Sequence, residues 1–367
     1  MNRKIKVGIT HGDTNGIGYE VILKMLEDSR IADLCTIVLY GSAKAAAFYR
    51  KSGELQPVQL QKIDTAADAH DGVFNIINVV PEDLKIEPGQ ATEIAGAAAF
   101  AALEAAVADL RAGDIDVLLT APINKHSIQS PTFKFPGHTE YLEASFRSDE
   151  NPDSRALMVL CTDELRVALV TTHLPISEVP SAITKEAVLG KIMDFNRSLH
   201  RDFGVLAPRI AVLSLNPHAG ENGLLGKEEA DIISPAIAEA REKKIMAFGP
   251  YAADGFFGSE NYKKFDGVLA MYHDQGLAPF KALAMDAGVN FTAGLPYVRT
   301  SPDHGTGYDI AGKGLADAES MRSALYMALD IFRNRRREDE AHRRPLRKQH
   351  YEKEKNSDPT IDLTKED

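Results

Sequence analysis

Three histidines occupy the same position relative to the apolar segments that precede them. His173, His218 and His273 each follow a short apolar run and enter a turn that contains proline or glycine. Imidazole is the commonest transition-metal ligand, and three protein ligands leave coordination positions open for a substrate. The spacing is not a compact metal motif such as HExxH, so three separate structural histidines remain the competing interpretation. In a metal site, Asp274 would be a further ligand or an orienting partner of His273.

A glycine-rich loop follows the first apolar segment. Gly12, Asp13, Gly16 and Gly18 lie in this loop, directly before a helical segment that starts at Tyr19. Glycines let the backbone approach a ligand closely, and the N-terminus of a helix favours an anion. The loop is not a GxGxxG fingerprint, so a tight turn between a strand and a helix explains it equally well.

Other segments carry groups that suit a phosphate or a carboxylate. His138 and Thr139 offer a cation and a hydroxyl after a Pro-Gly turn, although Thr139 is equally suited to cap a helix. Lys281 and Arg299 lie in an apolar, glycine-rich context that is less typical of solvated surface residues. Asp254 is a candidate pocket carboxylate, for which a turn-forming role is the simpler interpretation.

The elements that must position these groups alternate between short β-branched segments and longer helical ones. This alternation is typical of βα units around mostly parallel sheets, which bind ligands beyond the carboxyl ends of their strands. Five polar motifs follow predicted strands, so we expect them to meet there. The predicted strands are Lys4–Thr10, Thr36–Tyr40, Val73–Val79, Val117–Thr120, Ala156–Cys161, Val167–Thr171, Ile210–Leu215 and Gly267–Tyr272. The predicted helices are Tyr19–Asp28, Ala43–Lys51, Thr92–Ala112, Lys185–Asp202, Lys227–Lys244 and Ala316–Arg337.

Composition narrows the class of protein. With 367 residues, 44% of them hydrophobic, the chain is long enough for about two domains. The formal net charge of −11 is atypical of nucleic-acid binders, and no segment is apolar enough to suggest a signal peptide or a membrane span. The two cysteines, Cys35 and Cys161, form no CxxC pair. We therefore expect a reduced, cytoplasmic protein that binds neither nucleic acid nor membrane.

Six motifs, in order along the chain before a charged C-terminal tail, together resemble the 4-hydroxythreonine-4-phosphate dehydrogenase family. They are Gly12-Asp13 with Gly16-Ile17-Gly18, Pro136-Gly137-His138-Thr139-Glu140, Thr171-Thr172-His173-Leu174-Pro175, Asn216-Pro217-His218-Ala219-Gly220-Glu221, Tyr272-His273-Asp274-Gln275-Gly276 and Arg299-Thr300-Ser301-Pro302-Asp303-His304-Gly305-Thr306. Six segments in register are far more specific than any one of them.

The resemblance implies two α/β domains that flank a cleft, as in isocitrate and isopropylmalate dehydrogenases. The expected domains are residues 1–125 with 290–335, and residues 126–289 with the metal and dimer contacts; residues 336–367 are expected to form a charged, disordered tail. The family is a homodimer with shared active sites. The implied reaction is the NAD-dependent oxidation and decarboxylation of 4-phosphooxy-L-threonine to 3-amino-2-oxopropyl phosphate, in pyridoxal phosphate biosynthesis.

The resemblance also assigns roles to individual residues. One divalent metal ion (Zn, Mg or Co) falls on His173, His218 and His273, with the third supplied by a partner subunit. The implied substrate contacts are His138, Thr139, Lys281, Asn290 and Arg299. The implied contacts to NAD are Gly12, Asp13, Gly16, Gly18, His304, Gly305, Thr306 and Asp309. Lys281 and Asp254 are the candidates for the proton acceptor.

The chain departs from the family pattern where the family has Pro at the positions of His11 and Thr14 and Ala at the position of Asn15. The Asp254-Gly255-Phe256-Phe257 segment also differs from the family's usual Asp-Thr-Leu-Phe. These departures leave a 4-phospho-threonate or 4-phospho-erythronate dehydrogenase as an alternative. A metal-dependent sugar-phosphate lyase would need the same histidines without NAD, and a non-catalytic binding protein would need no metal.

Overall fold

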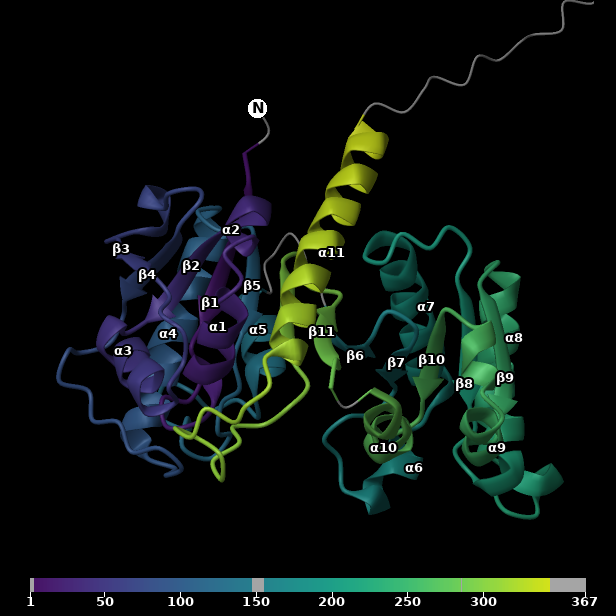
Figure 1. Ribbon diagram of the computed structural model, residues 1–367. Helices are drawn as coiled ribbons and strands as arrows, with labels where there is room; N and C mark the ends of the chain where they lie inside the picture. The colour runs from purple at the N-terminus through teal and green to yellow at the C-terminus, as the bar shows by residue number, and fades with distance from the viewer. Residues whose placement is uncertain (1–2, 147–154, 285, 344–367) are drawn as a thin grey trace, which may run out of the picture.

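The computed structural model describes residues 3–146, 155–284 and 286–343. Figure 1 shows two α/β halves, one on each side of the long helix α11 (Glu319–Arg343). The remaining helices are α1 (Gly18–Leu26), α2 (Ile31–Leu34), α3 (Ala43–Ser52), α4 (Glu93–Ala112), α5 (His138–Phe146), α6 (Val179–Ala182), α7 (Lys185–Arg201), α8 (Ser234–Glu242), α9 (Ala253–Gly258) and α10 (His273–Ala284). Short 3-10 segments are η1 (Ala66–Asp68), η2 (Ile176–Glu178), η3 (Pro217–Gly223) and η5 (Asn261–Lys264), and η4 (Glu229–Ile233) is a turn of π-helix.

One mixed sheet of 12 strands runs through both halves of the described chain. Its strands are β1 (Ile5–Thr10), β2 (Cys35–Gly41), β3 (Leu60–Lys62), β4 (Phe74–Asn78), β5 (Val117–Thr120), β6 (Leu157–Cys161), β7 (Arg166–Leu169), β8 (Arg209–Leu213), β9 (Met246–Tyr251), β10 (Gly267–Ala270), β11 (Val289–Ala293) and β12 (Val298–Pro302). Their order across the sheet is β3-β4-β2-β1-β5-β12-β11-β6-β7-β10-β8-β9.

Helix boundaries follow the capping chemistry of the sequence. Ser42, Thr92 and Thr184 lie directly before α3, α4 and α7, and each side chain accepts a hydrogen bond from a backbone N–H of the first turn. Helix α4 ends at Gly113, which adopts the left-handed conformation with φ 79°. These predicted helices are confirmed to within a few residues at each end.

The strand direction reverses in the middle of the sheet. Strands β1, β2, β4, β5 and β12 are parallel, and so are β7, β10, β8 and β9. Between them, β11 pairs antiparallel with both β12 and β6, and β6 pairs antiparallel with β7. The prediction of mostly parallel pairing is therefore confirmed, and the antiparallel pairs at the junction were not foreseen. The polar motifs cannot all meet beyond one row of carboxyl ends, because the two halves run in opposite directions.

The central strands present a shared polar face. Register pairs Asn290 with Leu160 on one side and with Ser301 on the other, and Thr292 with Met158. Side chains alternate along a strand, so residues two apart share a face. This face carries Met158, Leu160, Asn290, Thr292, Arg299 and Ser301. Strands β11 and β12 were not predicted, because each is only five residues long and pairs with segments far away in the sequence.

The core lies between the sheet and the helices on its faces. Every residue of β2 and β5 is buried, as expected for parallel strands covered on both sides. Cys35 and Cys161 are buried free thiols. Among the described residues, no helix is both long and apolar enough to cross a membrane.

The expected disorder from residue 336 onward is wrong for residues 336–343, which continue α11. Arg335 anchors this helix through a buried ion pair with Asp202, with Nε and Oδ1 2.6 Å apart. Arg201 reaches Asp339 at 2.9 Å, so charged side chains support the helix where apolar ones are scarce. Residues 344–367 lie outside the described residues. The division into 1–125 with 290–335 and 126–289 stays a prediction, since the sheet is continuous across it.

We expect Asp202→Ala to lower the free energy of unfolding by about 3–5 kcal/mol, because it leaves the Arg335 guanidinium buried without its carboxylate. Urea denaturation followed by circular dichroism measures the change. Asp339→Ala removes an exposed carboxylate from the same helix and is the matched control, with an expected cost below about 1 kcal/mol. Equal effects of the two variants would contradict the anchoring role.

Candidate active site

A pocket of ≈ 310 Å³ lies over the polar face of the central strands. The C-terminal ends of β5 and β12, the start of α5 and helix α10 contribute its walls. The predicted site residues that line it are His138, Thr139, His173, His273, Lys281, Asn290, Arg299, His304 and Gly305. The predicted site residues that do not line it are Gly12, Asp13, Gly16, Gly18, His218, Asp254, Thr306 and Asp309.

Arg299 supplies a buried positive charge to this pocket. Its Nε and Nη2 donate to the Thr120 hydroxyl at 3.1 and 2.6 Å, and its Nη1 donates to the Thr292 hydroxyl at 3.1 Å. Only 3% of the residue is exposed, and among the described residues no carboxylate pairs with it. Burial lowers the pKa of the guanidinium to about 10, so it remains charged at neutral pH. A buried cation with only hydroxyl partners favours an anionic ligand.

Three further polar atoms in this pocket are buried and lack a hydrogen-bond partner among the described residues. They are His138 Nε2, Asn290 Oδ1 and His304 Nε2. Burial, and then the charges of Arg299 and Lys125, hold the pKa of His138 well below its usual range. Its imidazole is therefore neutral and can donate or accept one hydrogen bond. Because buried polar groups are normally paired, this set indicates the place of a polar ligand.

The two histidines at the other end of the pocket lie side by side. The ring centroids of His173 and His273 are 5.9 Å apart. Glu140 Oε1 lies 3.5 Å from Nδ1 of His173, and Asp274 Oδ1 lies 2.7 Å from Nδ1 of His273. A carboxylate at Nδ1 leaves Nε2 of each ring available as a ligand atom, which is the usual arrangement around metal-binding histidines. Lys125 Nζ lies 3.4 Å from Nε2 of His173.

His218 does not join this pair. It is exposed and lies in the turn η3 after β8, outside the pocket. Within the described part of the chain, no group of three or more His, Cys, Asp or Glu side chains is arranged to hold a metal ion. One chain thus brings together two of the three predicted ligands, and they are the first and the third.

The two candidate proton acceptors are placed differently. Lys281 lines the pocket, with Nζ 3.7 Å from Oδ1 of Asp303. Burial raises the pKa of Asp303, and the charge of Lys281 opposes that shift. Asp254 lies exposed on α9 and does not line the pocket of its own chain.

The first loop is buried, and the structure accounts for its glycines by packing. A Cβ on Gly12 would lie 2.2 Å from the Pro122 carbonyl, and one on Gly16 would lie 2.7 Å from the Thr306 carbonyl. Asp13 accepts hydrogen bonds from the backbone N–H of Asn15 and the hydroxyl of Tyr308 at 2.8 Å each. A direct contact between this loop and a cofactor stays a prediction, since its side chains are enclosed.

Thr120, Lys125, Glu140 and Asp303 line the pocket but were given no role from the sequence. Lys125 follows the predicted strand Val117–Thr120, and Glu140 and Asp303 belong to two of the six motifs of the family resemblance; these are the signals that would have identified them. Thr120 is the last residue of β5, and its role became visible only through its hydrogen bonds with Arg299.

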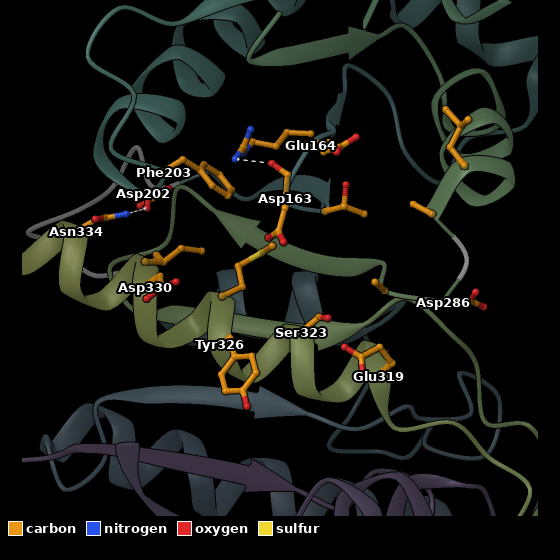
Figure 2. A pocket seen from close by; sticks show the side chains of 17 residues that line it. Asp163, Glu164, Asp202, Phe203, Asp286, Glu319, Ser323, Tyr326, Asp330 and Asn334 are labelled. Carbon is orange, nitrogen blue, oxygen red and sulfur yellow. Dashed lines mark hydrogen bonds between the residues drawn. The ribbon is translucent and has the colours of Figure 1, made fainter. Parts of the chain in front are cut away.

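A larger hollow of ≈ 690 Å³ lies elsewhere, between α11 and the segments around β7. Figure 2 shows carboxylates around its rim, including Asp163, Glu164, Asp286 and Glu319. Of the described residues that line this hollow, Arg166 is the only basic one. Repulsion between these carboxylates and an anion makes this hollow unsuitable for a phosphorylated acid, whereas the smaller pocket contains Arg299.

Comparisons with known proteins find similar sequences and structures over most of the chain. Residues 33–328 match the family model described as pyridoxal phosphate biosynthetic protein PdxA. The chain is 56% identical over 365 residues to a 4-hydroxythreonine-4-phosphate dehydrogenase of Bacteroides thetaiotaomicron, covering 99% of each chain. It is 42% identical to one of a Sulfurihydrogenibium species, covering 90% of this chain and 100% of that one. The crystal structure of such an enzyme from Klebsiella pneumoniae superposes with a TM-score of 0.76, at 35% identity, covering 90% of this chain and 99% of that one.

We expect stability to fall on acidification partly through His11. This ring is fully buried and stacked on Tyr19, and burial lowers its pKa from 6.5 to about 4. In the unfolded chain, His11 binds a proton as the pH falls below about 6.5, whereas in the folded chain it stays neutral until about pH 4. The contribution of the neutral ring to the free energy of unfolding is therefore complete above pH 6.5. About 3 kcal/mol is lost as the pH falls toward 4.

Urea denaturation between pH 7 and pH 4 measures the effect. His11→Phe keeps the stacking on Tyr19 and should flatten the decline relative to the wild type. His126→Gln, at an exposed position, is the control and should leave the decline unchanged. An identical decline in His11→Phe and the wild type would contradict this assignment.

Proposed function

The chain belongs to the family of the pyridoxal phosphate biosynthetic protein PdxA, and on that premise we propose that it is a 4-hydroxythreonine-4-phosphate dehydrogenase. It oxidises and decarboxylates 4-phosphooxy-L-threonine to 3-amino-2-oxopropyl phosphate, with NAD as the electron acceptor. The relatives named above carry this name over nearly their whole length.

The observation that supports this substrate most directly is the buried Arg299 without a carboxylate partner. A phosphate group bound beside it meets a fixed guanidinium, the Thr139 hydroxyl and the unpaired Nε2 of His138. Asn290 Oδ1 is an acceptor and suits a hydroxyl or ammonium group of the same substrate. The pocket therefore has one group of residues for the phosphate and a separate acceptor, Asn290, for a hydroxyl or ammonium group of the substrate.

One chain supplies only two of the three histidine ligands that we propose for a divalent metal ion. His173 and His273 would hold it through their Nε2 atoms, with Glu140 and Asp274 orienting the rings. We assign the missing ligand, His218, to a partner subunit; the sequence resemblance gave that place to the third histidine, which here lies beside His173. A metal held there would supply Lewis-acid polarisation of the C3 hydroxyl, and a bound nicotinamide would supply the hydride acceptor.

The residues of the chain itself bind, orient and exchange protons. Arg299, His138 and Thr139 fix the phosphate, and this places C3 toward the paired histidines. We assign the proton of the C3 hydroxyl to Lys281, which lies in the pocket and is held near Asp303. The same ammonium group returns a proton to C2 after carbon dioxide leaves. His304 and Gly305 line the pocket where we place the cofactor.

A second copy of the chain accounts for the exposed apolar residues next to the histidine turns. Leu174 and Ile176 follow His173 with 42% and 69% exposed, and Leu224 and Leu225 follow the His218 turn with 80% and 44% exposed. Large exposed apolar side chains of this kind are enriched in protein interfaces. A homodimer covers these residues and brings His218 to the other subunit's pocket.

The assay that tests the function follows NADH formation from 4-phosphooxy-L-threonine and NAD, with and without a chelator. We expect chelator-sensitive NADH formation, with a higher kcat/KM than for 4-phospho-threonate or 4-phospho-erythronate. A preference for either acid would transfer the assignment to that substrate. Substrate cleavage without NAD would instead favour a metal-dependent lyase.

We expect Arg299→Lys to raise the KM for the phosphorylated substrate by about 10–100-fold, the equivalent of one charge-assisted hydrogen bond. Lysine keeps the charge but cannot bond to Thr120 and the phosphate with a fixed planar fork. Initial rates of NADH formation measure the effect. Arg201→Lys, at a partly exposed position paired with Asp339, is the matched control. An unchanged KM in Arg299→Lys would place the phosphate elsewhere.

A further inference from the structure

The turn that carries His218 has an unusual backbone. His218, Ala219, Gly220, Glu221 and Asn222 have consecutive positive φ values between 43° and 80°. For L-residues this left-handed conformation is disfavoured, and it normally occurs at single positions. Consecutive residues in it persist only where surrounding groups hold them, so the structure must contain a group that fixes this turn.

The carboxylate of Glu229, at the start of the π-helical turn η4, lies against Gly220 of this turn and bonds to the residues that lead into it. Its Oε1 accepts hydrogen bonds from the backbone N–H groups of Leu215 and Asn216, both at 2.8 Å, and its Oε2 accepts one from Asn216 Nδ2 at 3.0 Å. Only 5% of Glu229 is exposed. Among the described residues, no Lys, Arg or His pairs with it, so its charge is directed at the two residues before the turn.

The neighbouring glycines leave room for this carboxylate. A Cβ on Gly220 would lie 2.6 Å from Glu229 Oε2, and a Cβ on Gly226 would lie 2.3 Å from Asn216 Nδ2. Both glycines have positive φ, at 80° and 138°. The turn is thus built around the carboxylate and the Asn216 amide, with no space for larger residues at these two places.

A chain of hydrogen bonds connects this turn with the one that carries His273. Ser214 Oγ donates to the Asn216 carbonyl at 2.9 Å, and Gln275 Nε2 donates to the Ser214 carbonyl at 2.6 Å. Gln275 Oε1 in turn accepts from the Met271 N–H at 2.7 Å. The Thr171 hydroxyl donates to the Met271 carbonyl at 2.8 Å, two residues before His173. The three histidine turns therefore share one hydrogen-bonded framework.

We propose that Glu229 is a positioning residue, which holds the left-handed turn so that His218 projects outward from its own subunit toward the metal site of a second copy. This inference rests on the proposed function, which makes His218 a ligand. The imidazole is exposed, and burial in its own subunit does not explain the disfavoured backbone. A disfavoured conformation that presents a candidate ligand is a feature of functional sites.

The test measures Zn²⁺ affinity of the full-length apoprotein by competition with a chromophoric chelator. Glu229→Gln replaces Oε2 with an amide that faces the Asn216 amide, donor against donor. We expect the affinity to fall about 10–100-fold, as for other groups that orient metal ligands. In a His218→Ala background, Glu229→Gln should cause no further loss of Zn²⁺ affinity, because it acts only by orienting His218. Glu242→Gln, an exposed glutamate on α8, is the matched control.

The outcomes separate this inference from the proposed function. If His218→Ala binds Zn²⁺ as the wild type does, the ligand assignment fails and the inference with it. Two results would overturn only the inference. In the first, His218→Ala loses Zn²⁺ affinity but Glu229→Gln does not. In the second, Glu229→Gln lowers the affinity by the same factor in the wild-type and the His218→Ala backgrounds. Asn216→Ala is a milder second variant that keeps both backbone hydrogen bonds. It should show a smaller loss that also vanishes in the His218→Ala background.

Discussion

The antiparallel pairing of β12, β11 and β6 is the constraint on which the site depends. It joins two parallel groups of strands that run in opposite directions, so no common row of carboxyl ends exists. Polar side chains must instead gather on a face. Alternation along the strands puts Asn290, Arg299 and Ser301 on that face, while Phe291 and Thr300 are buried on the other. The walls on either side then come from the ends of β5 and from the segments that carry His173 and His273.

This placement also sets the electrostatics of the pocket. A face in the middle of a large sheet is remote from solvent, which makes an unpaired charge there costly. The hydroxyls of Thr120 and Thr292 lower the desolvation cost of the Arg299 guanidinium by accepting its hydrogen bonds. Because these hydroxyls carry no charge, they do not neutralise it. A carboxylate in their place would neutralise the guanidinium and weaken its attraction for a phosphate. The pocket is therefore stable without a ligand and still favours an anion.

The sequence predicted those parts of the site that depend on local pattern. Histidines after apolar runs, the Pro-Gly turn before His138 and the capped helices were all recognisable, because each is determined by a few neighbouring residues. The strands β11 and β12 were missed, because their strand character comes from pairing with distant segments. The burial of the first loop and the separation of His218 from His173 likewise depend on tertiary packing. Helix α11 extends beyond its predicted end because Arg201 and Asp202, far away in sequence, pair with it.

In the His218 turn, the energetic cost of the left-handed backbone is offset by hydrogen bonds to Glu229. Four of its five left-handed residues are not glycine, and each costs about 1–2 kcal/mol. Glu229 accepts three charge-assisted hydrogen bonds, each worth about 1.5–3 kcal/mol. The two contributions are of similar size, so the turn can exist within a single chain. In the homodimer that we propose, assembly therefore need not supply the energy that shapes the turn. On that proposal, exposed apolar residues such as Leu224 and Ile176 stabilise the association, and His218 is already oriented before the subunits meet.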